Sequence, residues 1–178
     1  QRLEAPTGTS AGGGSSSSHN KVQQRYCYEE SKEWRRSGAL FRIVKEFGDI
    51  NRAVLFLLYC NEVHPECLLM LGSVLARYGR MDRALDMVRR ALYTYECASL
   101  ASFFPSTGNA GAGSGSGIAC VLDWRVPENA PLFTALFRYM HLVGMQGYHT
   151  LARDVARLLL SLSPDDPMLV LLALDHYL

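Results

Sequence analysis

Cysteine thiols and histidine rings are the side chains of this sequence that could carry out nucleophilic catalysis. Cys97 and Cys120 flank a glycine-rich run, and His141 and His149 follow it. A cysteine nucleophile needs a histidine base and a third group that orients the base. None of the five cysteines and five histidines occurs in a local signature of this kind. The sequence therefore predicts no enzymatic activity, with a Cys–His enzyme as a distant alternative.

The polar residues also lack the spacing of a metal or phosphate site. The sequence has no C-x-x-C pair and no zinc-type histidine spacing, and its cysteines lie on or beside apolar stretches, which indicates buried thiols in a reducing compartment. The run GAGSGSG does not lead from a strand into a helix that begins with Lys and Ser or Thr. Asp165, Asp166 and Asp175 lack the spacing of a calcium loop. We expect no cofactor and no metal.

Recognition chemistry is concentrated in the segment Asp123–Asn129, which reads DWRVPEN. Trp124 and Arg125 are residue types that often anchor protein interfaces. Pro127 and Pro131 lack the amide that a helix interior needs, so the segment should be a loop before a helix. Loops on rigid scaffolds often carry binding function. We therefore expect this segment to contact a partner.

The same segment has a purely structural interpretation. In it, Trp124 packs over the end of a helical array and Arg125 bonds to nearby backbone carbonyls. Glu128 and Asn129 would cap the helix that starts near Pro131, with the Asn129 side chain accepting hydrogen bonds from the first amides of that helix. The sequence alone leaves both interpretations open.

A denser basic group lies in the middle of the chain. Its members are Arg77, Arg80, Arg83, Arg89 and Arg90. Acidic residues are interspersed, and Asp86 precedes Arg90 by four positions, which favours a solvated helix face with internal ion pairs. The alternative is a contact with an acidic protein partner or with ribosomal RNA.

The elements that must position these residues have a helical period. Three apolar helix pairs are each broken at a glycine, and each glycine, Gly48, Gly79 and Gly147, lies five residues before an alanine. This order is typical of tetratricopeptide-type repeats of about 34 residues. In the middle pair Gly72 should lie where two helices approach closely. The sequence predicts an all-α fold of tetratricopeptide-like stacked helical hairpins, an α-solenoid; a helical bundle with glycine-containing turns is the alternative.

The glycines also predict the domain organisation. Their spacing is 31 residues and then 68, so an insertion interrupts the array between Tyr95 and Asn129. We expect a disordered segment over 1–20, two hairpins over 21–100, and a flexible Gly/Ser-rich insertion over 101–120. Residues 121–178 would hold the loop Asp123–Asn129, a third hairpin and the start of a further helix. Together these form one α-solenoid domain that is truncated at both ends.

Charge and hydropathy limit the partners and the compartment. The net charge is +1, so the chain lacks the field that draws in nucleic acid or anionic lipid, and no apolar run is long enough to span a bilayer. The chain begins at Gln1 and has no secretory leader pattern. We expect a cytosolic or nuclear fragment of a longer protein, with no membrane partner and no sequence-specific nucleic acid.

Five ordered stretches resemble the transcription factor 25 family, which includes the fungal subunit one of the ribosome quality-control complex. They are YCYEESKEW, HPECLLMLG, RALDMVRRALYTYECA, LDWRVPENAPLFTALFRYM and LLLSLSPDDPMLVLLALDHYL. The resemblance covers residues 26–178. We expect the partner-binding surface to consist of Asp123, Trp124, Arg125, Pro127, Glu128, Asn129, Arg90 and Tyr93.

The resemblance implies a non-enzymatic helical adaptor of ribosome-associated quality control. Such an adaptor would support ubiquitylation and extraction of stalled nascent chains on 60S ribosomal subunits. Its partners would be a Listerin-like E3 ubiquitin ligase, ubiquitin, a nascent-chain binding factor, a p97-type segregase and the 60S subunit itself. The location would be cytoplasmic and ribosome-associated, with the nucleus as a second site. The alternative is a nuclear transcriptional repressor that acts through protein–protein contacts.

Overall fold

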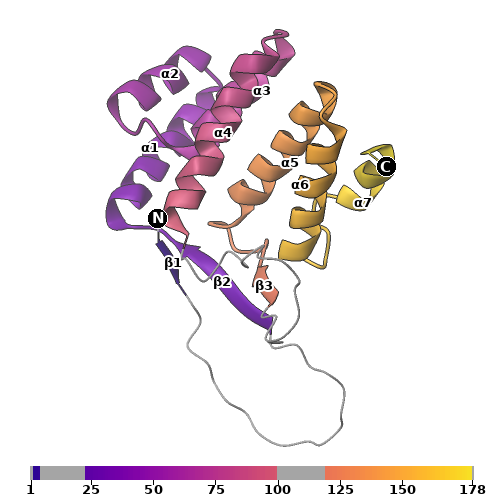
Figure 1. Ribbon diagram of the computed structural model, residues 1–178. Coiled ribbons are helices and arrows are strands. Elements are labelled where there is room, and N and C mark those ends of the chain that lie inside the picture. Colours follow the sequence, from indigo (N-terminus) through magenta and orange to yellow (C-terminus); the bar gives the residue numbers. More distant parts are fainter. Residues whose placement is uncertain (1, 5–22, 100–118, 178) are drawn as a thin grey trace, which may run out of the picture.

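The computed structural model describes residues 2–4, 23–99 and 119–177 (Figure 1). Helices dominate the described part of the chain, and each packs on the next in chain order. The predicted all-α solenoid of stacked hairpins is confirmed. The hairpins are α1 (Lys32–Phe47) with α2 (Ile50–Tyr59), α3 (Pro65–Arg77) with α4 (Met81–Ala98), and α5 (Ala130–Met145) with α6 (His149–Leu162), followed by α7 (Val170–Leu174) and the short 3-10 helix η1 (Asp175–Tyr177).

The hairpin turns are made at the glycines that the sequence pattern singled out. Gly48, Gly79 and Gly147 have φ values of 60°, 74° and 87°. A residue with a Cβ rarely adopts these values, so glycine suits the left-handed position that ends a helix. The Asp49 side chain then accepts a hydrogen bond from the Asn51 amide at 2.9 Å and caps α2. The predicted breaks between paired helices are confirmed.

Gly72 lies where α3 crosses α4. A Cβ atom built at Gly72 would meet the Ala84 carbonyl oxygen at 3.4 Å and the Val88 side chain at 3.5 Å. Ala84 and Ala91 on the facing helix are fully buried. Small residues on both sides thus permit the close approach that the sequence predicted.

The space at Gly72 predicts opposite effects for two substitutions. Gly72→Ala should raise the free energy of unfolding by about 0.5–1 kcal/mol, because its Cβ makes ordinary contacts and glycine is a poor helix former. Gly72→Leu should lower it by about 1–3 kcal/mol through overpacking. Urea denaturation of both variants checks this. A leucine variant as stable as the parent protein would show that the helices are not held in close contact here.

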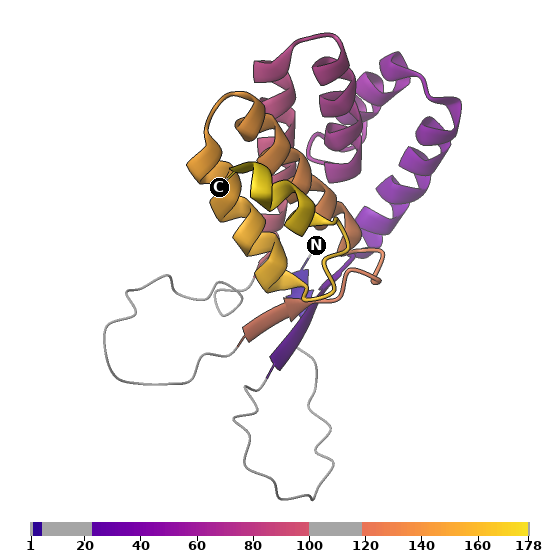
Figure 2. The same ribbon diagram turned by 90° about the vertical axis from the view of Figure 1, so that its right-hand side faces the viewer.

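A small sheet lies below the ends of the helices in the middle of the stack (Figures 1 and 2). Its strands are β1 (Arg2–Glu4), β2 (Gln23–Glu29) and β3 (Ala119–Leu122), in the order β1-β2-β3. Strand β1 is antiparallel to β2, and β3 is parallel to β2 with Tyr26 opposite Leu122. The sequence analysis did not predict this sheet. Strand β1 falls within residues 1–20, where disorder was expected; residues 1, 5–22 and 100–118 lie outside the described part of the chain.

Tyr28 fastens the sheet to the helices. Its side chain is buried, its hydroxyl lies 2.8 Å from the Ser99 hydroxyl, and its ring meets the Tyr95 ring edge-on with centroids 5.0 Å apart. Burial raises the pKa of the Tyr28 phenol, with the Ser99 hydrogen bond acting in the opposite direction. Leu122 of β3 is fully buried in the same core. The sheet therefore brings β2 and β3 together beside the end of α4.

Candidate functional site: the signature loop and the adjoining groove

The segment Asp123–Asn129, here called the signature loop, connects β3 to α5 through a series of turns. The Asp123 carboxylate accepts a hydrogen bond from the Arg125 amide at 3.0 Å, and the Asp123 carbonyl accepts one from the Val126 amide at 3.3 Å. These bonds close a turn that the following proline, Pro127, prevents from continuing as a helix. The predicted loop before a helix is confirmed.

Asn129 holds the loop from inside the protein. Its side chain is 0% exposed, its carbonyl oxygen accepts from the Tyr28 amide at 3.0 Å, and its amide nitrogen donates to the Asp123 carbonyl at 2.8 Å. The predicted role of Asn129 as a side-chain cap of α5 is wrong, because its side chain makes no capping bond to that helix. Both polar ends of the amide are used to join β2 to the start of the loop instead.

Trp124 and Arg125 are displayed at the surface of the loop. Trp124 is 37% exposed, and the Arg125 guanidinium lies 5.5 Å from the centre of the Trp124 ring. Arg125 also forms an ion pair with Asp165 at 3.3 Å, so its partner is a carboxylate and not the carbonyls considered from the sequence. Both charged side chains are more than half exposed, and such pairs contribute at most about 1 kcal/mol. A partner could therefore displace this pair at little cost.

Two predicted site residues, Arg90 and Tyr93, lie outside the signature loop. Arg90 and Tyr93 are exposed on α4, where Arg90 pairs with Asp86 at 3.0 Å instead of with a residue of the loop. Arg89 lies over the Tyr139 ring at 5.9 Å. The expected pair four residues apart on a helix is confirmed, and Arg77, Arg89 and Arg90 face three different neighbourhoods.

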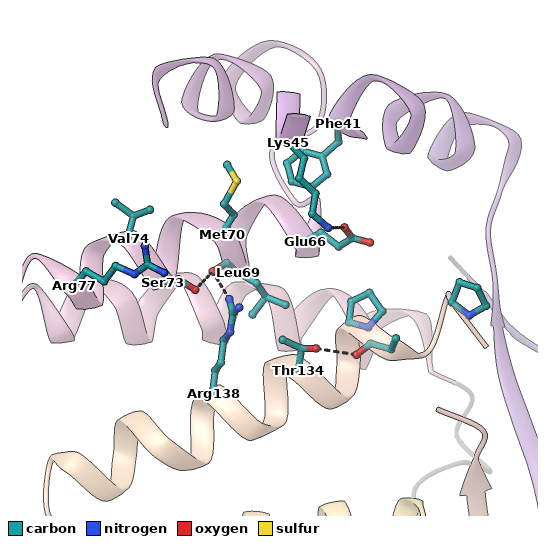
Figure 3. Close-up of a pocket in the computed structure, with 13 residues that line it drawn as sticks. Phe41, Lys45, Glu66, Leu69, Met70, Ser73, Val74, Arg77, Thr134 and Arg138 are labelled. Atoms are coloured by element: carbon teal, nitrogen blue, oxygen red, sulfur yellow. Dashed lines mark hydrogen bonds and ion pairs between the residues drawn. The ribbon is translucent and has the colours of Figure 1, made fainter. Parts of the chain in front are cut away.

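Pro127 and Glu128 face a groove that the sequence analysis did not identify. Two adjoining cavities of about 570 and 380 Å³ share Phe41, Glu66, Pro127 and Pro131 in their linings. They run along α1, α3 and the start of α5, as Figure 3 shows for the larger cavity. The first helices of the three hairpins therefore form a continuous groove that begins at the signature loop.

The two ends of the groove carry different charges. Glu30, Glu66 and Glu128 line the smaller cavity together with Arg35 and Arg42. Burial and the neighbouring Glu128 raise the pKa of Glu30, and the two arginines act in the opposite direction. Arg77 and Arg138 line the larger cavity, where burial and the neighbouring Arg77 lower the pKa of Arg138. Glu66 also pairs with Lys45 at 3.7 Å between the two ends. A segment bound along the groove therefore meets mixed charges beside the loop and an excess of positive charge at the other end.

His64 lies in the wall of the smaller cavity and is almost fully buried. Its ring stacks on Trp34 at 5.5 Å and packs against Phe41 at 4.7 Å and Phe56 at 5.4 Å. The Nδ1 atom accepts a hydrogen bond from the Cys67 amide at 3.4 Å and caps α3. Burial lowers the pKa of His64 to about 4, so the ring is neutral at pH 7.

The cysteines differ in exposure. Cys67 is buried, and burial raises the pKa of its thiol to about 12. Cys27, Cys60 and Cys97 are exposed free thiols, so the prediction of buried thiols is wrong for these three. Cys27 lies in the sheet, and Cys60 and Cys97 lie at helix ends. At these positions the neighbouring apolar residues do not carry the thiol into the core.

Within residues 2–4, 23–99 and 119–177, no group of His, Cys, Asp or Glu side chains is arranged to hold a metal ion. No helix in that same part of the chain is both long and apolar enough to cross a membrane.

Comparison with known proteins shows a match along most of the chain. A family model described as "Transcriptional repressor TCF25" matches residues 26–178. The human protein "Ribosome quality control complex subunit TCF25" is 33% identical over 152 residues, which cover 85% of this chain and 21% of that protein. The chain thus spans about a fifth of the length of this relative. No solved structure matches the chain.

Two fungal relatives show the range of names among similar proteins. "Ribosome quality control complex subunit 1" of Schizosaccharomyces pombe is 23% identical over 157 residues, covering 88% of this chain and 21% of that protein. "Probable transcription factor claV" of Ampulloclitocybe clavipes is 34% identical over 113 residues, covering 63% of this chain and 13% of that protein.

Proposed function

This chain belongs to the TCF25 family, and from that membership we propose that it is a non-enzymatic helical adaptor of the ribosome quality-control complex. In this role it supports the ubiquitylation and extraction of stalled nascent chains on 60S ribosomal subunits. Its partners are a Listerin-like E3 ubiquitin ligase, ubiquitin, a p97-type segregase and the 60S subunit. The names of the human and fission yeast relatives support the process.

The exposed Trp124–Arg125 pair is the observation that carries the adaptor role. Trp124 and Arg125 stand outward on a loop whose backbone is fixed by the buried Asn129 side chain. A rigid loop loses little conformational entropy on binding, and Trp and Arg are frequent anchors of interfaces. The signature loop is therefore suited to recognise a protein partner without any reaction centre.

Affinity capture from a lysate that contains stalled ribosomes tests this proposal. The chain, immobilised through a terminal tag, should recover the E3 ligase and ubiquitin conjugates, and more of both after translation has been stalled. A lysate without stalling is the matched control. Recovery of neither component under either condition would count against the adaptor role.

The double substitution Trp124→Ala with Arg125→Ala should reduce this capture roughly tenfold, because interface anchors of these types often contribute more than 1 kcal/mol each. Stability should fall by less than about 1 kcal/mol, since Trp124 is 37% exposed and the Arg125–Asp165 pair is a surface pair. Quantitative capture and urea denaturation measure the two effects.

Tyr78→Ala with Arg83→Ala is the matched control for that experiment, because it removes an exposed aromatic ring and an exposed arginine away from the loop. Its capture should equal that of the parent protein. A large loss of stability in the loop variant with unchanged capture would mean that Trp124 and Arg125 serve packing only.

A nuclear transcriptional regulator is the second candidate function. The description of the matching family model and the name of the Ampulloclitocybe clavipes relative favour it. In this role the same surface would bind chromatin-associated proteins. Cell fractionation separates the two candidates: a protein that stays on chromatin whether or not translation is stalled supports regulation of transcription, and one that moves to 60S particles on stalling supports quality control.

A further inference from the structure

The basic end of the groove has positive charges without a matching negative charge. Arg77 comes from the last turn of α3 and Arg138 from the middle of α5, and both line the larger cavity (Figure 3). Within the described residues, neither guanidinium forms an ion pair with a carboxylate. Lys45, which also lines this cavity, is already paired with Glu66. This end of the groove therefore has an excess of positive charge.

The Arg138 guanidinium is partly shielded from water but has no carboxylate partner in the described part of the chain. It is partly buried, and its guanidinium donates a hydrogen bond to the Leu69 carbonyl of α3. That bond leaves most of its five N–H donors for other acceptors. Burial and, to a smaller extent, the like charge of Arg77 lower the pKa of Arg138. An incoming carboxylate would be attracted by both arginines.

The floor of the groove is apolar and short. Met70 and Val74 are partly exposed along α3, and Phe41 stands opposite with Pro127 and Pro131 nearer the loop. From Glu66 to Arg77 the floor spans eleven helical residues, or roughly 16 Å at a rise of about 1.5 Å each. An extended peptide covers that length with about five residues.

The difference in charge balance between the two ends favours one direction for such a peptide. Beside the signature loop, three glutamates (Glu30, Glu66 and Glu128) and two arginines (Arg35 and Arg42) line the smaller cavity, so positive charge is not in excess there. A negative side chain is therefore better placed at the end where Arg77 and Arg138 lie, with apolar contacts between the two ends. Charge complementarity thus selects an acidic segment with an apolar neighbour.

We propose that this groove binds an extended acidic peptide segment of a protein partner, with an apolar side chain over Met70 and a carboxylate between Arg77 and Arg138. This binding goes beyond the adaptor role of the signature loop, and it does not depend on the cellular process in which the chain acts. The groove and the loop adjoin at Pro127, so one partner can occupy both.

Fluorescence anisotropy with the labelled peptide GSLFSDEGS tests the proposal. The peptide should bind saturably, and its amide counterpart GSLFSNQGS should bind at least roughly tenfold more weakly, which corresponds to about 1.4 kcal/mol. Affinity for the acidic peptide should fall as NaCl rises from about 50 to about 500 mM, because salt screens the charges. Equal binding of the two peptides, stronger binding of the basic peptide GSLFSKKGS, or no saturable binding of GSLFSDEGS overturns the proposal.

Arg77→Glu and Arg77→Gln are the variants of choice. Arg77 is exposed, whereas Arg138 also bridges two helices, so its loss could disturb packing. Arg77→Glu should weaken binding of GSLFSDEGS at least roughly tenfold, because it reverses the charge. Arg77→Gln should weaken binding by less, because it only neutralises the charge. Arg83→Glu makes the same charge change at an exposed site outside the groove and should stay within about twofold of the parent protein. An equal loss in Arg77→Glu and Arg83→Glu would show that only net charge matters, which contradicts the proposed site.

Discussion

Replacing Asn129 with alanine should lower the free energy of unfolding by about 3 kcal/mol, because the change leaves two backbone groups without their partner. The Tyr28 amide and the Asp123 carbonyl both bond to this one buried side chain, at 3.0 and 2.8 Å. Because the Asn129 side chain is 0% exposed, water cannot easily replace its hydrogen bonds in the variant. Urea denaturation at pH 7 measures the loss, which is a large part of the stability of an ordinary domain.

Two further substitutions show whether the hydrogen bonds cause this effect. Asn129→Asp keeps the shape and the acceptor but loses the donor to Asp123, and it should be more destabilising at pH 7 than at pH 5, where a protonated acid can donate. Asn51→Ala removes an exposed amide and should change stability by less than about 0.5 kcal/mol. An Asn129→Ala protein as stable as the Asn51→Ala control would mean that the loop is held by other contacts.

Acidification should destabilise the protein through His64. Burial lowers the pKa of this ring in the folded state from 6.5 to about 4, so between these values the unfolded chain binds more protons. Stability therefore falls as pH decreases from 6.5 to 4, by up to about 3 kcal/mol from this group. Protonation would also remove the Nδ1 acceptor that caps α3 at the Cys67 amide. Reversible urea denaturation at a series of pH values measures the slope.

The His64→Asn protein isolates this contribution. Asparagine can still accept from the Cys67 amide but does not titrate, so the variant should be less stable at pH 7 because of the cavity and should show a shallower slope between pH 6.5 and 4. His141→Asn, at an exposed position on α5, should retain the slope of the parent protein. Equal slopes in parent protein and His64→Asn would indicate that the acid sensitivity comes from other groups.

Local signals in the sequence were sufficient to predict the helices. Gly48, Gly79 and Gly147 end helices with positive φ, and Gly72 lies at a helix crossing, as expected. Each of these features depends on a few neighbouring residues and on conformational preferences that hold in any protein. The number and order of hairpins in the described part of the chain followed from them.

Contacts between distant segments could not be predicted in this way. Strands β2 and β3 are short, and their pairing joins residues on either side of the insertion, so no local pattern indicates it. The alternation of buried Tyr26 and Tyr28 with exposed Cys27 and Glu29 was the available signal for a strand. The capping role assigned to Asn129 was wrong for the same reason, because its partner Tyr28 lies on that distant strand.

The candidate site was predicted only in part. The signature loop was identified from residue types, and the structure leaves Trp124 and Arg125 exposed, as a contact surface requires. The groove was not predicted, because Arg77 and Arg138 become neighbours only when α3 and α5 stack. Arg77 was instead grouped with the arginines that follow it in sequence. Stacked hairpins thus create binding surfaces that a linear pattern does not contain.

A light-activated crosslinker at position 124, in the protein bound to purified stalled 60S particles, tests most directly whether the signature loop is the contact surface of a quality-control adaptor. A covalent adduct with the E3 ligase or with ubiquitin is predicted, with no adduct from the same crosslinker at position 83. If the protein binds the particles but position 124 yields no adduct with either component, or reacts only with chromatin proteins in cells, the account is contradicted.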